Sequence, residues 1–296
     1  MTARALLVIA LALAPFACGG PAGEGVPDAA PAAPGPAVAA EPTRPPPPLR
    51  RWRVEVVASY PHDAAAYTQG LLYDDGTLVE STGRYGVSEL RRVDLESGVV
   101  MRRVRLPDEL FAEGLARLPA AAGRPARLVQ LTWREGLAVV WDAASFARLG
   151  EHRYQGEGWG LCYDAGGEGS GGGRLVMSDG SSWLTFRDPE TFSELGGVEA
   201  SLEGSPLANL NELECVGGRV WANVFGSESL IEIDLADGRV TGVADASGLL
   251  DAGEARGVDV LNGIAYDPAD GTFLLTGKLW PKLFRVRLVE AAAADA

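Results

Sequence analysis

The sequence predicts an all-β protein whose folded part is a single five-bladed β-propeller spanning about residues 51–288. Three observations lead to this prediction. A short sequence motif, called the phrase below, recurs five times and marks five repeat units. Each unit contains short strand-like runs between turn residues. A further strand-like run precedes the first unit, and the last unit has one strand fewer. A pair of β-sandwiches with accidental internal similarity is the alternative architecture.

The recurring phrase places a polar or aromatic residue beside a glycine or, once, a glutamate, ahead of an apolar run. When Gly70, Gly114, Gly160, Glu212 and Gly263 are taken as equivalent, the successive spacings are 44, 46, 52 and 51 residues. Spacings of this size are typical of propeller blades and argue against a helical solenoid.

Strand-like runs rich in Val, Leu, Tyr and Trp follow each phrase, and they fit four strands per unit. In the first unit we expect strands at residues 78–81, 89–95 and 99–106. The second strand of the other units is expected at 128–131, 175–178, 220–224 and 273–276, and the third at 137–141, 184–187, 230–235 and 283–288. The Gly-rich run 166–173 is expected to be a surface loop.

The fifth unit ends after its third strand, and an extra strand at 52–59 precedes the first unit. We expect this N-terminal strand to pair as the outer strand of the last blade, because that pairing closes the ring and covers an exposed sheet edge.

Residues 1–18 have the character of an export segment. Arg4 precedes an apolar run, Ala5 to Ala14, that is too short to span a bilayer, and small residues follow. The surroundings of Cys18 resemble a bacterial lipoprotein cleavage site, which predicts lipidation of Cys18 and a periplasmic or cell-surface location. Soluble secretion and a retained anchor are the alternatives.

Three further segments follow the export segment. Residues 19–49 are rich in Pro, Ala and Gly and are expected to be a disordered tether. Residues 50–290 are expected to form the propeller domain, and residues 291–296 a disordered tail.

Composition excludes some classes of partner and site. Forty acidic against 26 basic side chains give a net charge of −14, which disfavours nucleic acid and anionic membranes and leaves lipid at Cys18 as the only membrane contact. A zinc site with the usual three or four nitrogen and sulfur ligands would use nearly all of the two histidines and three cysteines, which disfavours zinc. Export would allow a disulfide between Cys162 and Cys215, although two buried free thiols are equally compatible with the sequence.

The residues that begin the units occupy equivalent places near the propeller axis, so they are expected to converge around one central mouth. Each of these residues could instead have a purely structural role, in a turn or in a hydrogen bond to the next blade. The converging residues are Gln69, Glu113, Trp159, Asn211, Glu212 and Asn262.

Ten motifs resemble those of the glutamine cyclotransferases of plants and bacteria, the propeller-type glutaminyl-peptide cyclotransferases, over nearly the whole folded region. Tyr67 stands where Phe is common in the family, and residues 166–173 lengthen one loop. The motifs lie at residues 60–63, 67–71, 80–83, 112–115, 131–133, 158–161, 209–214, 221–224, 261–268 and 276–281.

The resemblance implies conversion of the N-terminal glutamine of a peptide or protein to pyroglutamate with release of ammonia, and it implies no metal or other cofactor for the chemistry. We expect Glu113 to carry the proton, because it begins a unit and burial would raise its pKa toward working pH. Lys278 is expected either to neutralise charge on the amide oxygen or to set the pKa of Glu113 or Glu80.

The remaining candidates are expected to bind substrate. Glu80 could hold the substrate ammonium or cap a loop, and Glu212 is a third carboxylate with the same ambiguity. Trp133, Trp159 and Trp280 could form an apolar wall or fill core. Neutral donors and acceptors for the carboxamide, or alternatively turn residues, are Gln69, Asn211, Asn223 and Asn262.

Two other functions fit the same sequence. A catalytically silent propeller could bind peptides at its mouth, since fold does not fix activity. A calcium-dependent propeller hydrolase could use the paired Asn and Glu oxygens as metal ligands. A structural calcium ion on the axis also stays open.

Overall fold

The computed structural model describes residues 47–121, 123–166 and 172–291, and these residues form 22 strands and no helix. The protein is therefore all-β in its described part, and that part has no helix that could span a membrane. The export segment, Cys18, the tail beyond residue 291, and most of the tether and of the 166–173 loop lie outside the described residues.

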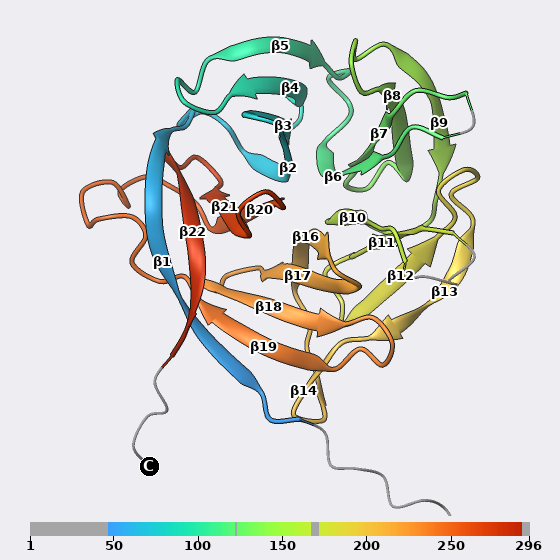
Figure 1. Ribbon diagram of the computed structural model, residues 1–296. Coiled ribbons are helices and arrows are strands. Elements are labelled where there is room, and N and C mark those ends of the chain that lie inside the picture. The colour runs from blue at the N-terminus through green and yellow to red at the C-terminus, as the bar shows by residue number, and fades with distance from the viewer. Residues whose placement is uncertain (1–46, 122, 167–171, 292–296) are drawn as a thin grey trace, which may run out of the picture. The chain divides into compact units, whose positions relative to one another are not determined.

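Three of the sheets are four-stranded antiparallel meanders, in which consecutive strands pair (Figure 1). The first comprises β2 (Thr68–Asp74), β3 (Thr77–Thr82), β4 (Glu89–Asp94) and β5 (Val100–Arg105). The second comprises β6 (Ala112–Leu118), β7 (Arg127–Thr132), β8 (Leu137–Asp142) and β9 (Arg148–Arg153), and the third β10 (Leu161–Asp164), β11 (Arg174–Met177), β12 (Trp183–Arg187) and β13 (Glu194–Glu199).

The largest sheet has eight strands in the order β16-β17-β18-β19-β1-β22-β21-β20. It joins two meanders through β1 (Arg50–Pro61). One meander is β16 (Leu210–Val216), β17 (Arg219–Val224), β18 (Ser229–Asp234) and β19 (Val240–Asp245); the other is β20 (Leu261–Asp267), β21 (Thr272–Gly277) and β22 (Lys282–Glu290). A separate two-stranded ribbon consists of β14 (Ser201–Leu202) and β15 (Ser205–Pro206).

The N-terminal strand β1 covers two sheet edges. It pairs antiparallel with β22 from Trp52 opposite Glu290 to Pro61 opposite Lys282, the pairing expected from the sequence. Its first four residues also pair in parallel with β19, which the sequence did not predict. The Trp52 ring lies 5.4 Å from the ring of Trp221 on β17, so side-chain packing accompanies the second pairing.

The strand predictions are confirmed, with ends that differ by no more than two residues. For example, the run expected at 283–288 is β22 (Lys282–Glu290), and the run expected at 128–131 is β7 (Arg127–Thr132). Some strands, such as β7 and β22, extend past the apolar run, and others, such as β5 (Val100–Arg105 against the expected 99–106), stop short of it, because strand ends lack a sharp hydrophobic signal.

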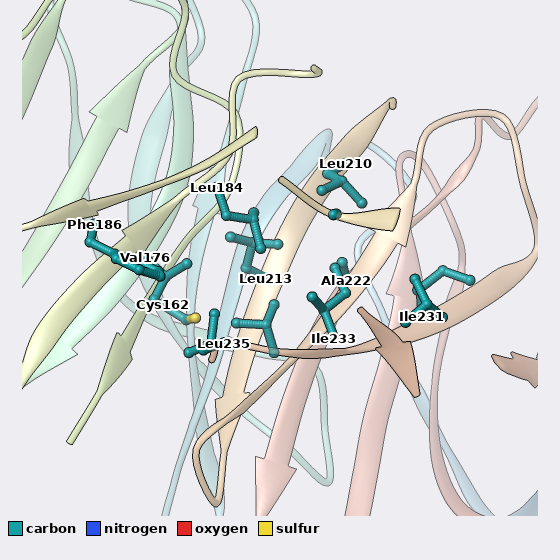
Figure 2. Packing of buried hydrophobic residues seen from close by; sticks show 13 residues of the cluster. Cys162, Val176, Leu184, Phe186, Leu210, Leu213, Ala222, Ile231, Ile233 and Leu235 are labelled. Carbon is teal, nitrogen blue, oxygen red and sulfur yellow. The ribbon is translucent and has the colours of Figure 1, made fainter. Parts of the chain in front are cut away.

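The core lies between neighbouring sheets, where their apolar faces meet. Figure 2 shows one such layer, in which Val176 and Leu184 of one sheet pack toward Leu213 and Ile233 of the next. The whole cluster is buried, with Val176, Leu184 and Ile233 fully inaccessible to solvent.

The first strands of the sheets contact one another in the order β2, β6, β10, β16, β20 and back to β2. Glycine makes this approach possible, because a Cβ on Gly114 would lie 2.5 Å from the backbone nitrogen of Leu161, and a Cβ on Gly160 would lie 2.0 Å from the carbonyl oxygen of Asn211. Figure 1 shows the five strands facing one another in the middle of the folded unit.

At the fourth of these positions, on β16, Glu212 stands in place of glycine. The Glu212 carboxylate accepts hydrogen bonds from the backbone N–H of Ile264 at 2.7 Å and of Leu71 at 3.3 Å. Glu214, two residues further along β16, accepts the N–H of Tyr266 at 3.1 Å. Burial raises the pKa of Glu214 to about 8, against the opposing hydrogen bond from Tyr266.

A disulfide links Cys162 on β10 to Cys215 on β16, with a Cα–Cα distance of 5.4 Å. Of the two alternatives that the sequence left open, the structure contains the bonded one. The bond ties together two sheets whose first strands are also in contact.

Replacing both Cys162 and Cys215 with alanine should lower the free energy of unfolding. The disulfide closes a chain separation of 53 residues, so removing it releases about 4 kcal/mol of unfolded-chain entropy. Urea denaturation measures the difference. A reductant should destabilise the wild type but not the double variant, and equal stability of the oxidised wild type and the variant would contradict the prediction.

The elevated pKa of Glu214 makes stability depend on pH. A carboxyl group that binds its proton more tightly in the folded state stabilises the protein at low pH, and this stabilisation is lost as pH rises. For Glu214 the loss occurs between its ordinary pKa of 4.5 and about 8. Glu214→Gln cannot titrate, so its unfolding free energy should fall less than that of the wild type over this interval. Urea titrations at successive pH values test this, and parallel curves would refute it.

Candidate active site

Pairing irregularities occur near the start of four of the five first strands. The pairing of β2 with β3 slips between Thr68 and Gly70, and that of β6 with β7 slips between Ala112 and Leu115. The same slip occurs in β16 and β20. A β-bulge of this kind redirects the extra side chain. The residues at the slips include Gln69, Glu113, Asn211 and Asn262.

These strands surround a cavity of about 280 Å³. Its wall combines an apolar ring with a few polar groups, the composition typical of a small-molecule site. The lining residues are Tyr67, Gln69, Phe111, Glu113, Trp133, Trp159, Asn211, Phe225 and Lys278.

Glu113 is the buried carboxylate of the cavity, with 4% of its surface exposed. Its Oε1 atom accepts a hydrogen bond from Gln69 Nε2 at 2.9 Å. Burial raises the pKa of Glu113 well above its usual value; the charge of Lys278 opposes this, and those of Glu157 and Glu135 add to it. A carboxyl with this environment exchanges a proton at a higher pH than an ordinary glutamate does.

Lys278 presents a buried ammonium to the same cavity. Its Nζ lies 4.9 Å from the Tyr67 ring centre and 5.4 Å from that of Phe225. Burial lowers the pKa of Lys278, while Glu113 and Asp259 oppose the shift. Backbone hydrogen bonds to Asp259 and Val260, each 2.9 Å long, fix the position of the lysine in the chain.

Aromatic rings complete the wall through edge contacts. Phe111 lies 5.5 Å from Trp133 and 6.3 Å from Tyr67, centre to centre, and Trp159 lies 6.0 Å from Phe225. Edge-to-face contacts of this kind stabilise a rigid apolar surface.

Sequence comparisons identify the family. A sequence model described as glutamine cyclotransferase matches residues 31–288. A glutaminyl-peptide cyclotransferase of Arabidopsis thaliana is 39% identical over 246 residues, which cover 81% of this chain and 72% of that protein. The chain belongs to the glutamine cyclotransferase family.

Structural comparison agrees with this family assignment. The crystal structure of Myxococcus xanthus glutaminyl cyclase is similar with a TM-score of 0.71 and 42% sequence identity, covering 83% of this chain and all of that one. The resemblance inferred from ten sequence motifs is thereby confirmed.

Six of the predicted site residues of this glutamine cyclotransferase line the cavity together, although their sequence positions span more than two hundred residues. Tyr67, Phe111 and Phe225 were missed, because an aromatic residue in or beside a motif gives no signal that distinguishes a cavity wall from core. The six residues are Gln69, Glu113, Trp133, Trp159, Asn211 and Lys278.

Glu80 is not among the residues that line the cavity. The carboxylate is fully buried and is engaged by Arg91 Nη2 at 2.8 Å, Thr68 Oγ1 at 2.7 Å and His62 Nε2 at 3.1 Å. Burial opposes ionisation, but Arg91 and His62 lower the pKa of Glu80 to about 2. Its oxygens are saturated by protein partners, so none is free for a ligand.

His62 lies in the loop that follows β1, and its buried side chain belongs to the Glu80 cluster. Its Nδ1 is 2.7 Å from the carbonyl oxygen of Trp280. Burial disfavours the charged ring, yet the Glu80 carboxylate raises the pKa of His62 overall.

Four further candidates do not line the cavity, because their side chains bind the backbone of neighbouring strands. Besides Glu212, Asn223 Oδ1 accepts the N–H of Gly263 at 2.9 Å and Asn262 Nδ2 donates to the Thr68 carbonyl at 2.9 Å. Trp280 Nε1 donates to the Asp259 carbonyl at 2.9 Å. Each of these side chains thus makes a structural contact, the alternative that the sequence had left open.

Glu80→Gln should destabilise the protein without weakening substrate binding. The change leaves Arg91 with a buried, partly unpaired charge, which costs about 3 kcal/mol or more. Chemical denaturation measures the loss, and KM measured below the unfolding transition should stay near the wild-type value. A large rise in KM with unchanged stability would restore the substrate-binding role.

Proposed function

We propose that this chain cyclises the N-terminal glutamine of peptides or proteins to pyroglutamate and releases ammonia. One observation carries the proposal: the buried carboxyl of Glu113 and the buried ammonium of Lys278 line the same small aromatic cavity. The family and the activities named for the two relatives support it.

The reaction requires one proton to move between two nitrogens. The substrate's α-amine attacks its own side-chain carbonyl carbon, a C–N bond forms, and the bond from that carbon to the amide nitrogen breaks. The attacking nitrogen loses a proton and the leaving nitrogen gains one, so ammonia departs and no external reactant is consumed. In this proposal Glu113 accepts the first proton and donates the second, and its raised pKa suits both transfers.

Negative charge builds on the carbonyl oxygen during attack, and Lys278 is the cation placed to stabilise it. Asn211 supplies an acceptor for the carboxamide NH₂. Its Oδ1 atom is buried and has no hydrogen-bond partner among the described residues. A site with a free amide oxygen favours an amide over an acid, because an ionised acid has no hydrogen to donate.

The aromatic wall serves the same reaction. Trp133 and Trp159 present rings to the cavity, where a π face attracts the substrate ammonium and apolar surface excludes bulk water. Tyr67 and Phe225, which flank Lys278, strengthen the electrostatic effect of that ammonium by removing it from solvent.

We propose that the fold is a five-bladed propeller in which β1 is the outer strand of the last blade. Support comes from the cyclic order of contacts among β2, β6, β10, β16 and β20 and from the pairing of β1 with β22. In such a ring each first strand lies nearest the axis, which accounts for the convergence of residues from separate repeats.

Export of the chain, with lipidation at Cys18 as the preferred outcome, is also proposed. The disulfide between Cys162 and Cys215 supports an oxidising compartment. The proposed proton transfers need no metal, and a structural calcium ion is not required by any of them.

Glu113→Gln should reduce turnover by at least about 10²-fold, because it retains the shape of the side chain but cannot accept a proton. Ammonia release from a Gln-initiated peptide, measured on the full chain, tests this. Thermal unfolding of the variant should stay close to that of the wild type. A chelator should not change wild-type turnover, which separates this mechanism from a calcium-dependent hydrolase.

Wild-type protein that binds the peptide but releases no ammonia would refute the proposed function in favour of a silent binding protein. Retained turnover in Glu113→Gln would refute the assigned proton carrier alone.

A further inference from the structure

We propose that Glu157 is a positioning residue that locks the two tryptophans of the cavity wall and thereby sets the affinity for the glutamine substrate. A single carboxylate oxygen, Glu157 Oε2, accepts the indole N–H of Trp133 at 2.7 Å and that of Trp159 at 3.0 Å. The proposal deepens the proposed function, on which its consequence for substrate affinity rests.

The shared oxygen fixes two rings that belong to different sheets. Trp133 follows β7, and Trp159 precedes β10, so Glu157 in the connection after β9 bridges the second and third sheets. An indole has one polar hydrogen, and holding that hydrogen restricts rotation of the ring. Both rings line the cavity, so their orientation decides its shape.

The second oxygen of Glu157 is also used. Oε1 accepts a hydrogen bond from Arg134 Nε at 2.9 Å, and the Arg134 guanidinium stacks 3.6 Å from the centre of the Trp133 ring. Trp133 is thus held by its nitrogen and by its face. Burial of Glu157 opposes ionisation, but the hydrogen bonds from Trp159, Arg134 and Trp133 lower its pKa, so these are charge-assisted bonds at neutral pH.

Glu157 is not itself among the residues that line the cavity, and its side chain is about one-third exposed. It therefore acts through the tryptophans. Its charge also contributes to the raised pKa of Glu113, as does the charge of Glu135. Glu135 accepts from Tyr85 and from the Phe111 backbone rather than from an indole, which makes it a charge-matched comparison.

Glu157→Ala should raise KM about tenfold while changing kcat less than about threefold, since one charge-assisted hydrogen bond corresponds to a factor of this size. KM should change more than kcat because the substitution frees the two tryptophan rings of the cavity wall but leaves Glu113 and Lys278 in position. Glu157→Gln retains an acceptor oxygen and should recover most of the affinity. Glu135→Gln removes the same charge and should raise KM less than Glu157→Ala does.

A second readout does not need turnover. In ¹H–¹⁵N spectra of the substrate-free protein, Glu157→Ala should shift the indole signals of Trp133 and Trp159, assigned with Trp133→Phe and Trp159→Phe, and leave the other indole signals in place. Glu157→Gln should shift them less.

Unchanged indole signals together with unchanged KM in Glu157→Ala would overturn the proposal. Equal rises of KM in Glu157→Ala, Glu157→Gln and Glu135→Gln would also overturn it, because they would assign the effect to charge alone. If the wild type releases no ammonia, the proposed function fails. The positioning role of Glu157 can still be tested then, by comparing the indole spectra and the peptide-binding constants of the same variants.

Discussion

The close contact between first strands of neighbouring sheets is the constraint on which the site depends. Strand backbones meet where a side chain would collide, so Gly114 and Gly160 occupy two of these contacts. At a third, Glu212 binds the backbone N–H groups of two strands instead. These contacts hold the bulges in place, and the bulges aim polar side chains into one cavity.

The pKa of a buried carboxylate in this protein is raised or lowered according to the partners of that carboxylate. Glu113 faces the cavity and accepts a hydrogen bond from a neutral amide, and burial outweighs the charge of Lys278, so the pKa of Glu113 rises. Glu80 is equally buried, but Arg91 pairs with it directly and its pKa falls to about 2. Glu113 therefore exchanges a proton at a higher pH than an ordinary glutamate does, whereas Glu80 stays ionised and structural. Glu157 represents a third case, in which an ionised carboxylate orders aromatic rings.

Strands could be predicted from the sequence more reliably than the surroundings of individual side chains. Turn residues and apolar runs located the strands because both signals are local. Glu113 was found because it begins a repeat. The partners of Glu80 were not predicted, because its motif does not reveal that Arg91 and His62 approach it. Glu157 was missed altogether, since nothing in the sequence around a surface carboxylate indicates that it lies between two indoles.

The sequence alone determined the all-β class, the repeat, the order of the strands, the pairing of β1 with β22 and the family. These follow from periodicity and motif order, which are properties of the chain itself. Only the tertiary structure decided which polar residues share the cavity, which bind the backbone, and that Cys162 meets Cys215. The reason is physical: burial and partner distance set both the pKa and the availability of a polar group, and these arise only when distant segments pack together.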